Sequence, residues 1–194
     1  IMLAAPLLAR IIANPVVGAL ADRSGRARAA LVICSAAVTI GTGLLAFAGG
    51  FLPILLLVVA IALAQGPLIA LTDAVTLRSL NELRAPELRY GRIRLWGSAG
   101  FAIANLSAGW MLEWLPASSI IGMLLLSALA TTLAAWAVAV IRVPERPAAA
   151  TQPAGKLASP HLLVLTIAGA ALVQASHAAV YGFSTLHWQS LGMS

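Results

Sequence analysis

Long apolar blocks alternate with short polar segments along this chain. A helix of about 20 apolar residues is long enough to cross a hydrocarbon layer of roughly 30 Å. Six blocks reach this length, and the pattern therefore predicts an all-α polytopic membrane protein with six transmembrane helices. The blocks are Ile1 to Leu20, Ala29 to Ala48, Phe51 to Leu77, Leu95 to Leu115, Ala117 to Ile141 and His161 to Leu186.

The composition excludes an ordinary soluble domain. Of the 194 residues, 61% are hydrophobic and 9% are charged, whereas about a quarter of the residues are charged in a typical soluble protein. A soluble core could not bury this much apolar surface. Cys34, the single cysteine, lies inside the second block and has no disulfide partner in the chain, so we expect it to serve as packing.

The basic residues indicate topology rather than nucleic-acid binding. A net charge of +6 could attract a phosphate backbone, but eleven of the twelve Lys and Arg residues fall in the segments 21–28, 78–94 and 142–160. These are alternate connectors, and Lys and Arg accumulate in cytoplasmic connectors. We therefore expect these three loops to be cytoplasmic, the Ser194 end to be outside, lipid to be a partner and nucleic acid not to be one.

The connector between the first two blocks has the most specific local pattern. Gly18 permits close helix contact, and Gly25 permits a sharp reversal between two membrane helices. Asp22 is placed to pair with an arginine or with the positive amino end of a helix. The run resembles the signature loop between helices two and three of the major facilitator superfamily, through Gly18, Leu20, Asp22, Arg23, Gly25 and Arg26. Ala27 departs from that pattern, because a further basic residue is common there.

A second run, from Tyr90 to Phe101, is similar to the start of helix five in the branch that holds lactose permease and 3-phenylpropionate permease. The resemblance implies helices two to seven of a twelve-helix transporter in a bacterial-type inner (plasma) membrane, monomeric at full length. Residues 1–141 would then be helices two to six of the amino-terminal bundle and 142–160 a cytoplasmic linker. Residues 161–194 would contain helix seven, the start of the carboxy-terminal bundle, with helices missing at both ends.

Arg10 is the basic residue that lies outside the three connectors. It precedes Asp22 by 12 residues, about 18 Å along a helix, which is near the middle of the bilayer. Ionisable groups at this depth are costly and usually functional. We expect Arg10 to face the bundle interior or a wet cavity and to bind a carboxylate of the solute or of the protein. A structural ion pair remains the alternative.

Asp73 is an acid within the third block, about 7 Å along the helix from Arg78. The resemblance places Asp73 where lactose permease has a sugar-binding glutamate, and it matches Arg94 to the arginine that pairs with that acid. The implied hypothesis is an Asp73–Arg94 pair that holds solute and helps to couple proton movement. A purely structural pair at the cytoplasmic end is an equal alternative.

Two polar stripes predict cavity faces. Arg94, Ser98, Phe101 and Asn105 follow at spacings of four, three and four, so they share one helix face. Phe101 matches a tryptophan that faces the sugar in lactose permease, and either an aromatic platform or simple packing would explain it. The last block has a similar stripe of Gln174, His177, Tyr181, Ser184 and Trp188.

His177 titrates near physiological pH and could bind solute or carry a proton, or it could be satisfied by an interhelical hydrogen bond. A similar Ser-His and Tyr grouping occurs in the phenylpropionate-permease relatives, where Ser176, His177 and Tyr181 match it.

No enzyme constellation is present in the sequence: we find no metal-ligand cluster, phosphate loop or nucleophile beside a base. We expect a transporter without cofactors, driven by a proton gradient, that carries a small organic solute by alternating access. Arg10 and the phenylpropionate resemblance favour an aromatic carboxylate, whereas Asp73, Arg94 and Phe101 favour a sugar, and nucleosides stay open. A channel and a non-transporting membrane sensor are the alternatives of another class.

Overall fold

The computed structural model describes residues 4–82 and 87–140, together with residues 164–165, 168–169, 172 and 190–192. The chain divides into two units, Ile1–Pro147 and Ala148–Ser194. The boundary falls inside the range 142–160, but the linker and the assignment of helix seven stay predictions. Most of the block from His161 to Leu186 lies outside the described residues.

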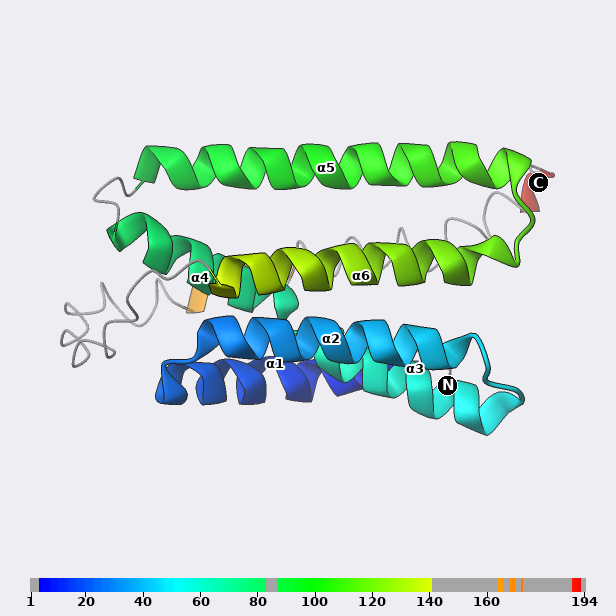
Figure 1. Cartoon of the computed structure of the whole chain (residues 1–194), viewed down its shortest axis with the longest axis horizontal. Coiled ribbons are helices and arrows are strands. Elements are labelled where there is room, and N and C mark those ends of the chain that lie inside the picture. The colour runs from blue at the N-terminus through cyan, green and yellow to red at the C-terminus, as the bar shows by residue number, and fades with distance from the viewer. Residues whose placement is uncertain are drawn as a thin grey trace. The chain divides into compact units, whose positions relative to one another are not determined.

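The first unit consists of helices, as the sequence pattern predicts. Each of the first five blocks coincides with helical structure, although the third block forms two helices instead of one. The described helices are α1 (Ala4–Ser24), α2 (Ala27–Leu45), α3 (Phe51–Gln65), α4 (Leu68–Glu82), α5 (Glu87–Trp114) and α6 (Ser119–Val140) (Figure 1).

Within the described residues, four helical stretches are long and apolar enough to cross a membrane. They are Ala4–Ser24, Ala27–Leu45, Phe51–Leu80 and Ser119–Val140. The third stretch joins α3 and α4, so these two helices together form the single span expected from Phe51 to Leu77. α5 is long enough but is not among the four, because basic residues fill its first turns and polar residues such as Ser98 and Asn105 follow. That α5 spans the membrane stays a prediction.

The expected long connector from Arg78 to Arg94 is wrong. α4 continues to Glu82 and α5 begins at Glu87, so both arginines lie on helices. The charges end the hydrophobic pattern, but Arg, Leu and Glu are good helix formers and do not end the helix. Loss of apolar character therefore marks where the chain would leave the hydrocarbon layer, not where the helix stops.

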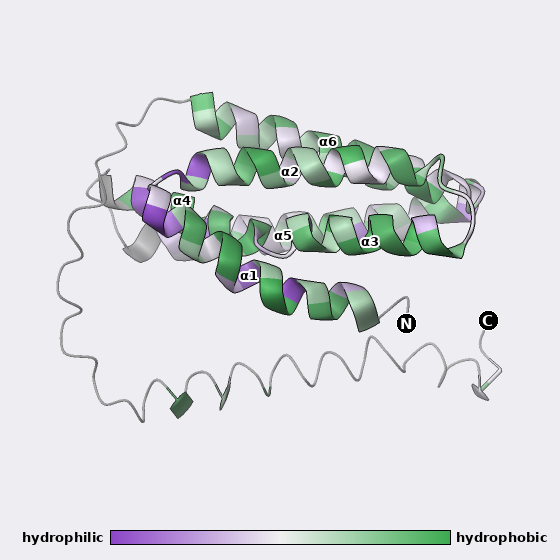
Figure 2. Cartoon of the chain, turned by 90° about the horizontal axis from the view of Figure 1, so that it is seen from below, coloured by the Kyte–Doolittle hydropathy of each residue, from purple (hydrophilic) through white to green (hydrophobic). Residues whose placement is uncertain are grey.

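The turn between α1 and α2 is tight and centred on Gly25. Gly25 has a φ of +67°, a left-handed conformation that glycine adopts without a steric penalty. Its amide donates to the carbonyl of Asp22 at 3.3 Å, while the Ser24 hydroxyl donates to the carbonyl of Leu20 at 2.7 Å. The predicted reversal at Gly25 is confirmed. Hydrophilic residues gather where α1 meets α2 and along α4 (Figure 2).

Small side chains build the core of this unit. α2 packs against α6 and α3, α1 packs against α3, and α4 packs against α2. The Thr39 and Thr132 hydroxyls form a hydrogen bond of 2.8 Å between α2 and α6. Cys34 is buried, which confirms its expected place in the packing. The central cluster consists of Ala21, Ala27, Leu31, Cys34, Leu71, Val75 and Ala135.

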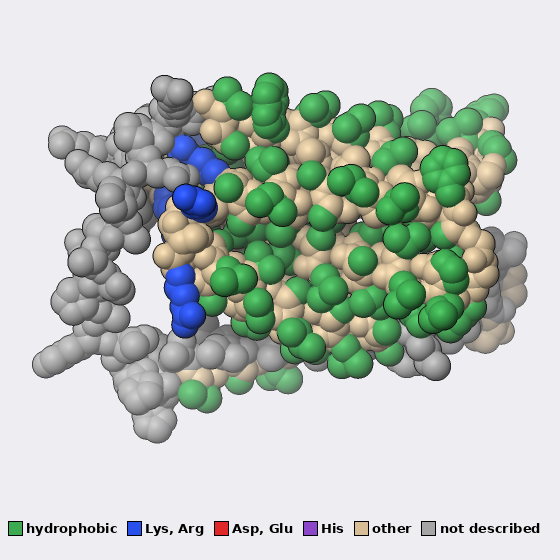
Figure 3. Space-filling view, turned by 60° about the horizontal axis from the view of Figure 1, so that its bottom comes forward, with side chains coloured by type: hydrophobic (Ala, Val, Ile, Leu, Met, Phe, Trp, Pro, Cys, Tyr) green, Lys and Arg blue, Asp and Glu red, His purple; other side chains and the backbone are tan. Residues whose placement is uncertain are grey.

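Large apolar side chains lie on the outside. Leu7, Ile11 and Phe47 are exposed by 60%, 68% and 89%, which suits a surface that faces lipid rather than water. On the face that Figure 3 shows, apolar side chains cover most of the helices and Lys or Arg side chains gather near one end. This separation agrees with the topology that the basic residues predict.

α2 packs closely on α3 at Gly41. A Cβ at Gly41 would lie 2.7 Å from Ile61 Cγ1, whereas a Cβ at Gly43 would meet only Leu125 Cδ1, at an ordinary 3.7 Å. Replacing a mid-helix Gly by Ala normally favours the helix by up to about 1 kcal/mol, but overpacking costs about 1–3 kcal/mol. We expect Gly41→Ala to lower the thermal unfolding temperature in detergent and Gly43→Ala to preserve or raise it. Equal unfolding temperatures for the two variants would contradict the close contact.

Candidate functional site

Asp73 on α4 and Arg94 on α5 form the ion pair that the resemblance to lactose permease implies. Arg94 Nη1 donates to both carboxylate oxygens of Asp73, at 2.8 Å each. The Asp73 side chain is 35% exposed and the Arg94 side chain 55% exposed. Tyr90, one turn before Arg94, accepts from the same Nη1 through its hydroxyl oxygen at 3.5 Å. The pair is present in the structure, and its role in solute binding stays a prediction.

This pair lies in the wall of a pocket of about 520 Å³ between α4 and α5. Arg94, Ser98 and Phe101 all line the pocket, as their shared helix face predicts. Asn105 is not among the lining residues, and its side-chain amide donates to the Phe101 carbonyl of its own helix at 2.8 Å. The remaining lining residues are Leu68, Ile69, Thr72, Asp73, Thr76, Tyr90, Ile93 and Gly97.

Sequence reasoning missed three polar residues of this pocket, although their spacing could have revealed them. Tyr90 precedes Arg94 by four residues, so it extends the same α5 stripe toward the start of the helix. Thr72 and Thr76 lie one residue before and three residues after Asp73 on α4. In a sequence, a threonine within an apolar helix gives no sign of a binding role, because Ser and Thr hydroxyls often bond to the backbone of their own helix. Thr72 does so, donating to the Leu68 carbonyl at 2.7 Å.

Arg10 on α1 has a neutral partner instead of a carboxylate. Its Nη2 donates to Gln65 Oε1 at 2.6 Å, and in the part of the chain that the structure describes it forms no ion pair. Arg10 Nε is shielded from solvent and has no hydrogen-bond acceptor there. A buried donor without an acceptor costs about 1–3 kcal/mol. Gln65 was missed because the sequence search looked for ionisable groups.

The break between α3 and α4 positions this second polar contact. Pro67 has no N–H to donate to the carbonyl four residues earlier, and its ring crowds that carbonyl, so the helix is interrupted. Gly66 lies directly under α1: a Cβ there would overlap Asn14 Oδ1 and would lie 3.2 Å from Arg10 Cγ. Glycine at this position therefore permits Arg10 and Asn14 to lie against the break.

The signature loop is held to α4 by an ion pair. Arg78 Nη2 lies 3.1 Å from Asp22 Oδ1, with the side chains 43% and 71% exposed, respectively. The sequence indicated an arginine partner for Asp22 but did not identify Arg78. Arg23 and Arg26 flank the turn. The close helix contact expected at Gly18 is wrong for the described structure, because a Cβ there would meet nothing within 4 Å. α1 is thus joined to α3 through Arg10 and Gln65 and to α4 through Asp22 and Arg78. At the rise of an α-helix these two contacts are roughly 18–20 Å apart.

The Asp22–Arg78 pair should contribute little to stability, because exposed ion pairs are worth about 0–1 kcal/mol. In a double-mutant cycle of Asp22→Asn and Arg78→Gln, we expect a coupling energy below about 1 kcal/mol in chemical unfolding. A coupling energy above about 2 kcal/mol would show that the pair is shielded from water in the folded protein.

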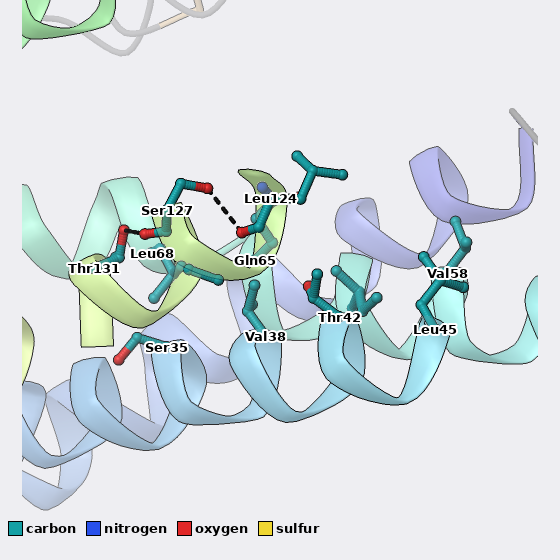
Figure 4. Close-up of a pocket in the computed structure, with 12 residues that line it drawn as sticks. Ser35, Val38, Thr42, Leu45, Val58, Gln65, Leu68, Leu124, Ser127 and Thr131 are labelled. Carbon is teal, nitrogen blue, oxygen red and sulfur yellow. Dashed lines mark hydrogen bonds between the residues drawn. The ribbon is translucent and has the colours of Figure 1, made fainter. Parts of the chain in front are cut away.

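A second cavity, of about 290 Å³, lies between α2, α3 and α6 and also has Gln65 in its wall (Figure 4). Three of its four hydroxyl groups, those of Ser35, Ser127 and Thr131, already donate within their own helices. Ser127 donates to the Leu124 carbonyl at 2.8 Å and Thr131 to the Ser127 carbonyl at 2.9 Å. This cavity therefore presents few unused donors, in contrast to the pocket that contains the Asp73–Arg94 pair.

His177 and Tyr181, which the sequence assigned to solute or proton binding, lie outside the described residues. Within the described residues, no group of three or more His, Cys, Asp or Glu side chains is placed to hold a metal ion.

Within its described residues, the first unit is apolar and helical and has a charged pocket between α4 and α5, as expected of a polytopic membrane protein with a polar site. The model of the MFS_1 like family matches residues 1–194, and the chain belongs to this family, as its resemblance to the major facilitator superfamily predicts. The two relatives described next are named as a transporter and a permease.

Two relatives with known names are similar to this chain. The probable 3-phenylpropionic acid transporter of Escherichia coli (strain K12) is 30% identical over 201 residues, which cover 100% of this chain and 51% of that protein. The maltose permease of Geobacillus stearothermophilus is 31% identical over 106 residues, which cover 55% of this chain and 26% of that protein. The chain spans about half the length of the first relative and about a quarter of the second. No solved structure matches the chain.

Proposed function

We propose that the protein is a secondary active transporter that moves a small organic solute across a bacterial inner membrane by proton symport with alternating access. The observation that carries this proposal is the Asp73–Arg94 ion pair in the wall of the pocket between α4 and α5. Charged side chains are rare within membrane helices and mark solute or proton pathways. The volume of about 520 Å³ falls in the range of small-molecule sites.

Three side chains of the pocket, those of Asp73, Arg94 and Phe101, have distinct parts in the proposed cycle. Arg94 binds an oxygen of the solute, since its guanidinium offers several donors and Asp73 occupies one nitrogen. Asp73 alternates between its ion pair with Arg94 and a protonated state, and this exchange couples proton and solute. Phe101 supplies an apolar face against a ring. In this proposal His177 and Tyr181, which lie outside the described residues, take part in coupling, and Asn105 borders the solute path.

The solute we favour is an aromatic carboxylate of the phenylpropionate type. The relative that matches the whole chain is a probable 3-phenylpropionic acid transporter, and Arg10 has no carboxylate partner in the described structure. A sugar is the second candidate, because Thr72, Thr76, Tyr90 and Ser98 give the pocket four hydroxyl groups and one relative is a maltose permease.

Uptake by membrane vesicles that contain the full-length protein tests the proposal. Labelled 3-phenylpropionate and maltose are offered separately, with an imposed inward proton gradient and with the gradient collapsed. We expect 3-phenylpropionate to accumulate above its external concentration only with the gradient. Equilibration at the same rate in both conditions would rule out symport, non-saturable flux would indicate a channel, and saturable binding without flux would indicate a sensor.

A further inference from the structure

We propose that Arg10 and Gln65 form a carboxylate-binding site, separate from the Asp73–Arg94 pair, that takes the carboxylate of a monocarboxylate solute. This inference rests on the proposed transport function and names the residues that would recognise the anionic group. It begins from an arginine in mid-membrane whose partner is neutral. Arg10 Nη2 is bonded to Gln65 Oε1, while Arg10 Nε is shielded from solvent and has no acceptor in the described structure.

The hydrogen-bonding geometry of arginine favours a carboxylate at this point. A guanidinium has five N–H groups in one plane and binds a carboxylate through two parallel hydrogen bonds. Gln65 provides a single oxygen to Nη2 and no charge. The Nη–H groups that do not contact Gln65 can therefore donate to an incoming carboxylate, while Gln65 keeps the guanidinium in place. Nε–H, which is covered in this structure, lies in the same plane and is the second donor once the carboxylate displaces the atoms over it.

Arg10 differs from Arg78 and Arg94 because its charge is not balanced by an acid of the described structure. Arg78 is neutralised by Asp22 and Arg94 by Asp73. Arg10 forms no ion pair with a described residue, although it lies about 18 Å along α1 from Asp22, at the depth where an unpaired charge is most costly. An anionic solute would remove that cost upon binding, and a neutral solute would not. The inference therefore selects carboxylates over uncharged sugars.

The two polar sites are separated along the helix direction. Gln65 precedes Asp73 by eight residues, which corresponds to about 12 Å along α3 and α4. Gln65 lines the cavity between α2, α3 and α6, whereas Asp73 lines the pocket between α4 and α5, and Leu68 borders both. A variant at Gln65 can thus change anion recognition without altering the Asp73–Arg94 pair.

Gln65→Glu provides the sharpest test, because it offers Arg10 a carboxylate from the protein itself at the position of Oε1. In the purified full-length protein, binding of 3-phenylpropionate and of its neutral amide is measured by ligand-induced thermal stabilisation and by equilibrium binding. We expect Gln65→Glu and Arg10→Gln to weaken acid binding at least about 30-fold and to change amide binding less than about 3-fold. The matched variant Gln65→Leu removes the hydrogen bond without adding charge, so it should weaken acid binding less than Gln65→Glu does, and the difference measures the effect of the added carboxylate.

The outcomes separate this inference from the transport proposal. If Gln65→Glu binds the acid as tightly as the unmodified protein does while vesicles still accumulate it, the Arg10 site is wrong and transport stands. If vesicles show no accumulation but the acid stabilises the unmodified protein and not Gln65→Glu, the site stands and transport is wrong. If Gln65→Glu raises the unfolding temperature and no carboxylate stabilises the unmodified protein, Arg10 is structural and the inference fails.

Discussion

Replacing Arg94 by Gln should lower gradient-driven solute accumulation by roughly 10- to 100-fold. The substitution removes both 2.8 Å hydrogen bonds to Asp73 and leaves its carboxylate without a cation in the pocket between α4 and α5. Hydrogen bonds to charged groups contribute about 1.5–3 kcal/mol, and each 1.4 kcal/mol corresponds to a factor of ten. Initial uptake rates and equilibrium binding, measured on the same vesicles, would show whether binding or translocation is lost.

The controls for this prediction lie on the same helices. Arg92 lies two residues from Arg94 on α5 and does not line the pocket, so Arg92→Gln should leave accumulation within about 2-fold. Arg94→Lys keeps the charge but loses the planar fork of donors and should restore only part of the activity. If Arg94→Gln and Asp73→Asn both leave accumulation intact, the ion pair is structural and the pocket needs another explanation.

The sequence predicted the Asp73–Arg94 pair because two kinds of information coincided there. An acid within an apolar block is unusual enough to be noticed, and the run from Tyr90 to Phe101 resembles a known family closely enough to supply its partner. Neither kind of information was present for Gln65. It is neutral and lies within an apolar stretch, and its importance depends on Arg10, which is 55 residues away in the chain.

The helices were predictable because the membrane dictates both their length and their apolar character, whereas their ends and breaks were not. Hydropathy does not register the break at Gly66 and Pro67, since the residues on both sides are apolar and form a continuous stretch from Phe51 to Leu80. The same measure ended α4 too early, at Leu77, and began α5 too late, at Leu95. Backbone hydrogen bonding, rather than side-chain polarity, decides where a helix stops.

We expect Gly66→Leu, a substitution at the break between α3 and α4, to lower the free energy of unfolding by about 2–4 kcal/mol. A Cβ at Gly66 would overlap Asn14 Oδ1 and press on Arg10 Cγ at 3.2 Å, so a leucine side chain must push both of these side chains aside and crowd α1 against the break. Overpacking of this kind costs about 1–3 kcal/mol, and the Arg10–Gln65 hydrogen bond would be lost as well. Gly122 on α6 has nothing within 4 Å of its Cβ position, and Gly122→Leu should cost less than about 1 kcal/mol in the same unfolding experiment.

A double substitution separates local crowding from a general effect on the helix. In Asn14→Ala the side chain that Gly66 accommodates is shortened, so adding Gly66→Ala to that variant should cost less than adding it to the unmodified protein. Residues in direct contact show coupling energies of about 0.5–3 kcal/mol in such cycles. A coupling energy near zero would mean that glycine is not needed there for the approach of α1. With substantial coupling, carboxylate binding should fall in parallel with stability, because the displacement of α1 moves Arg10 away from Gln65.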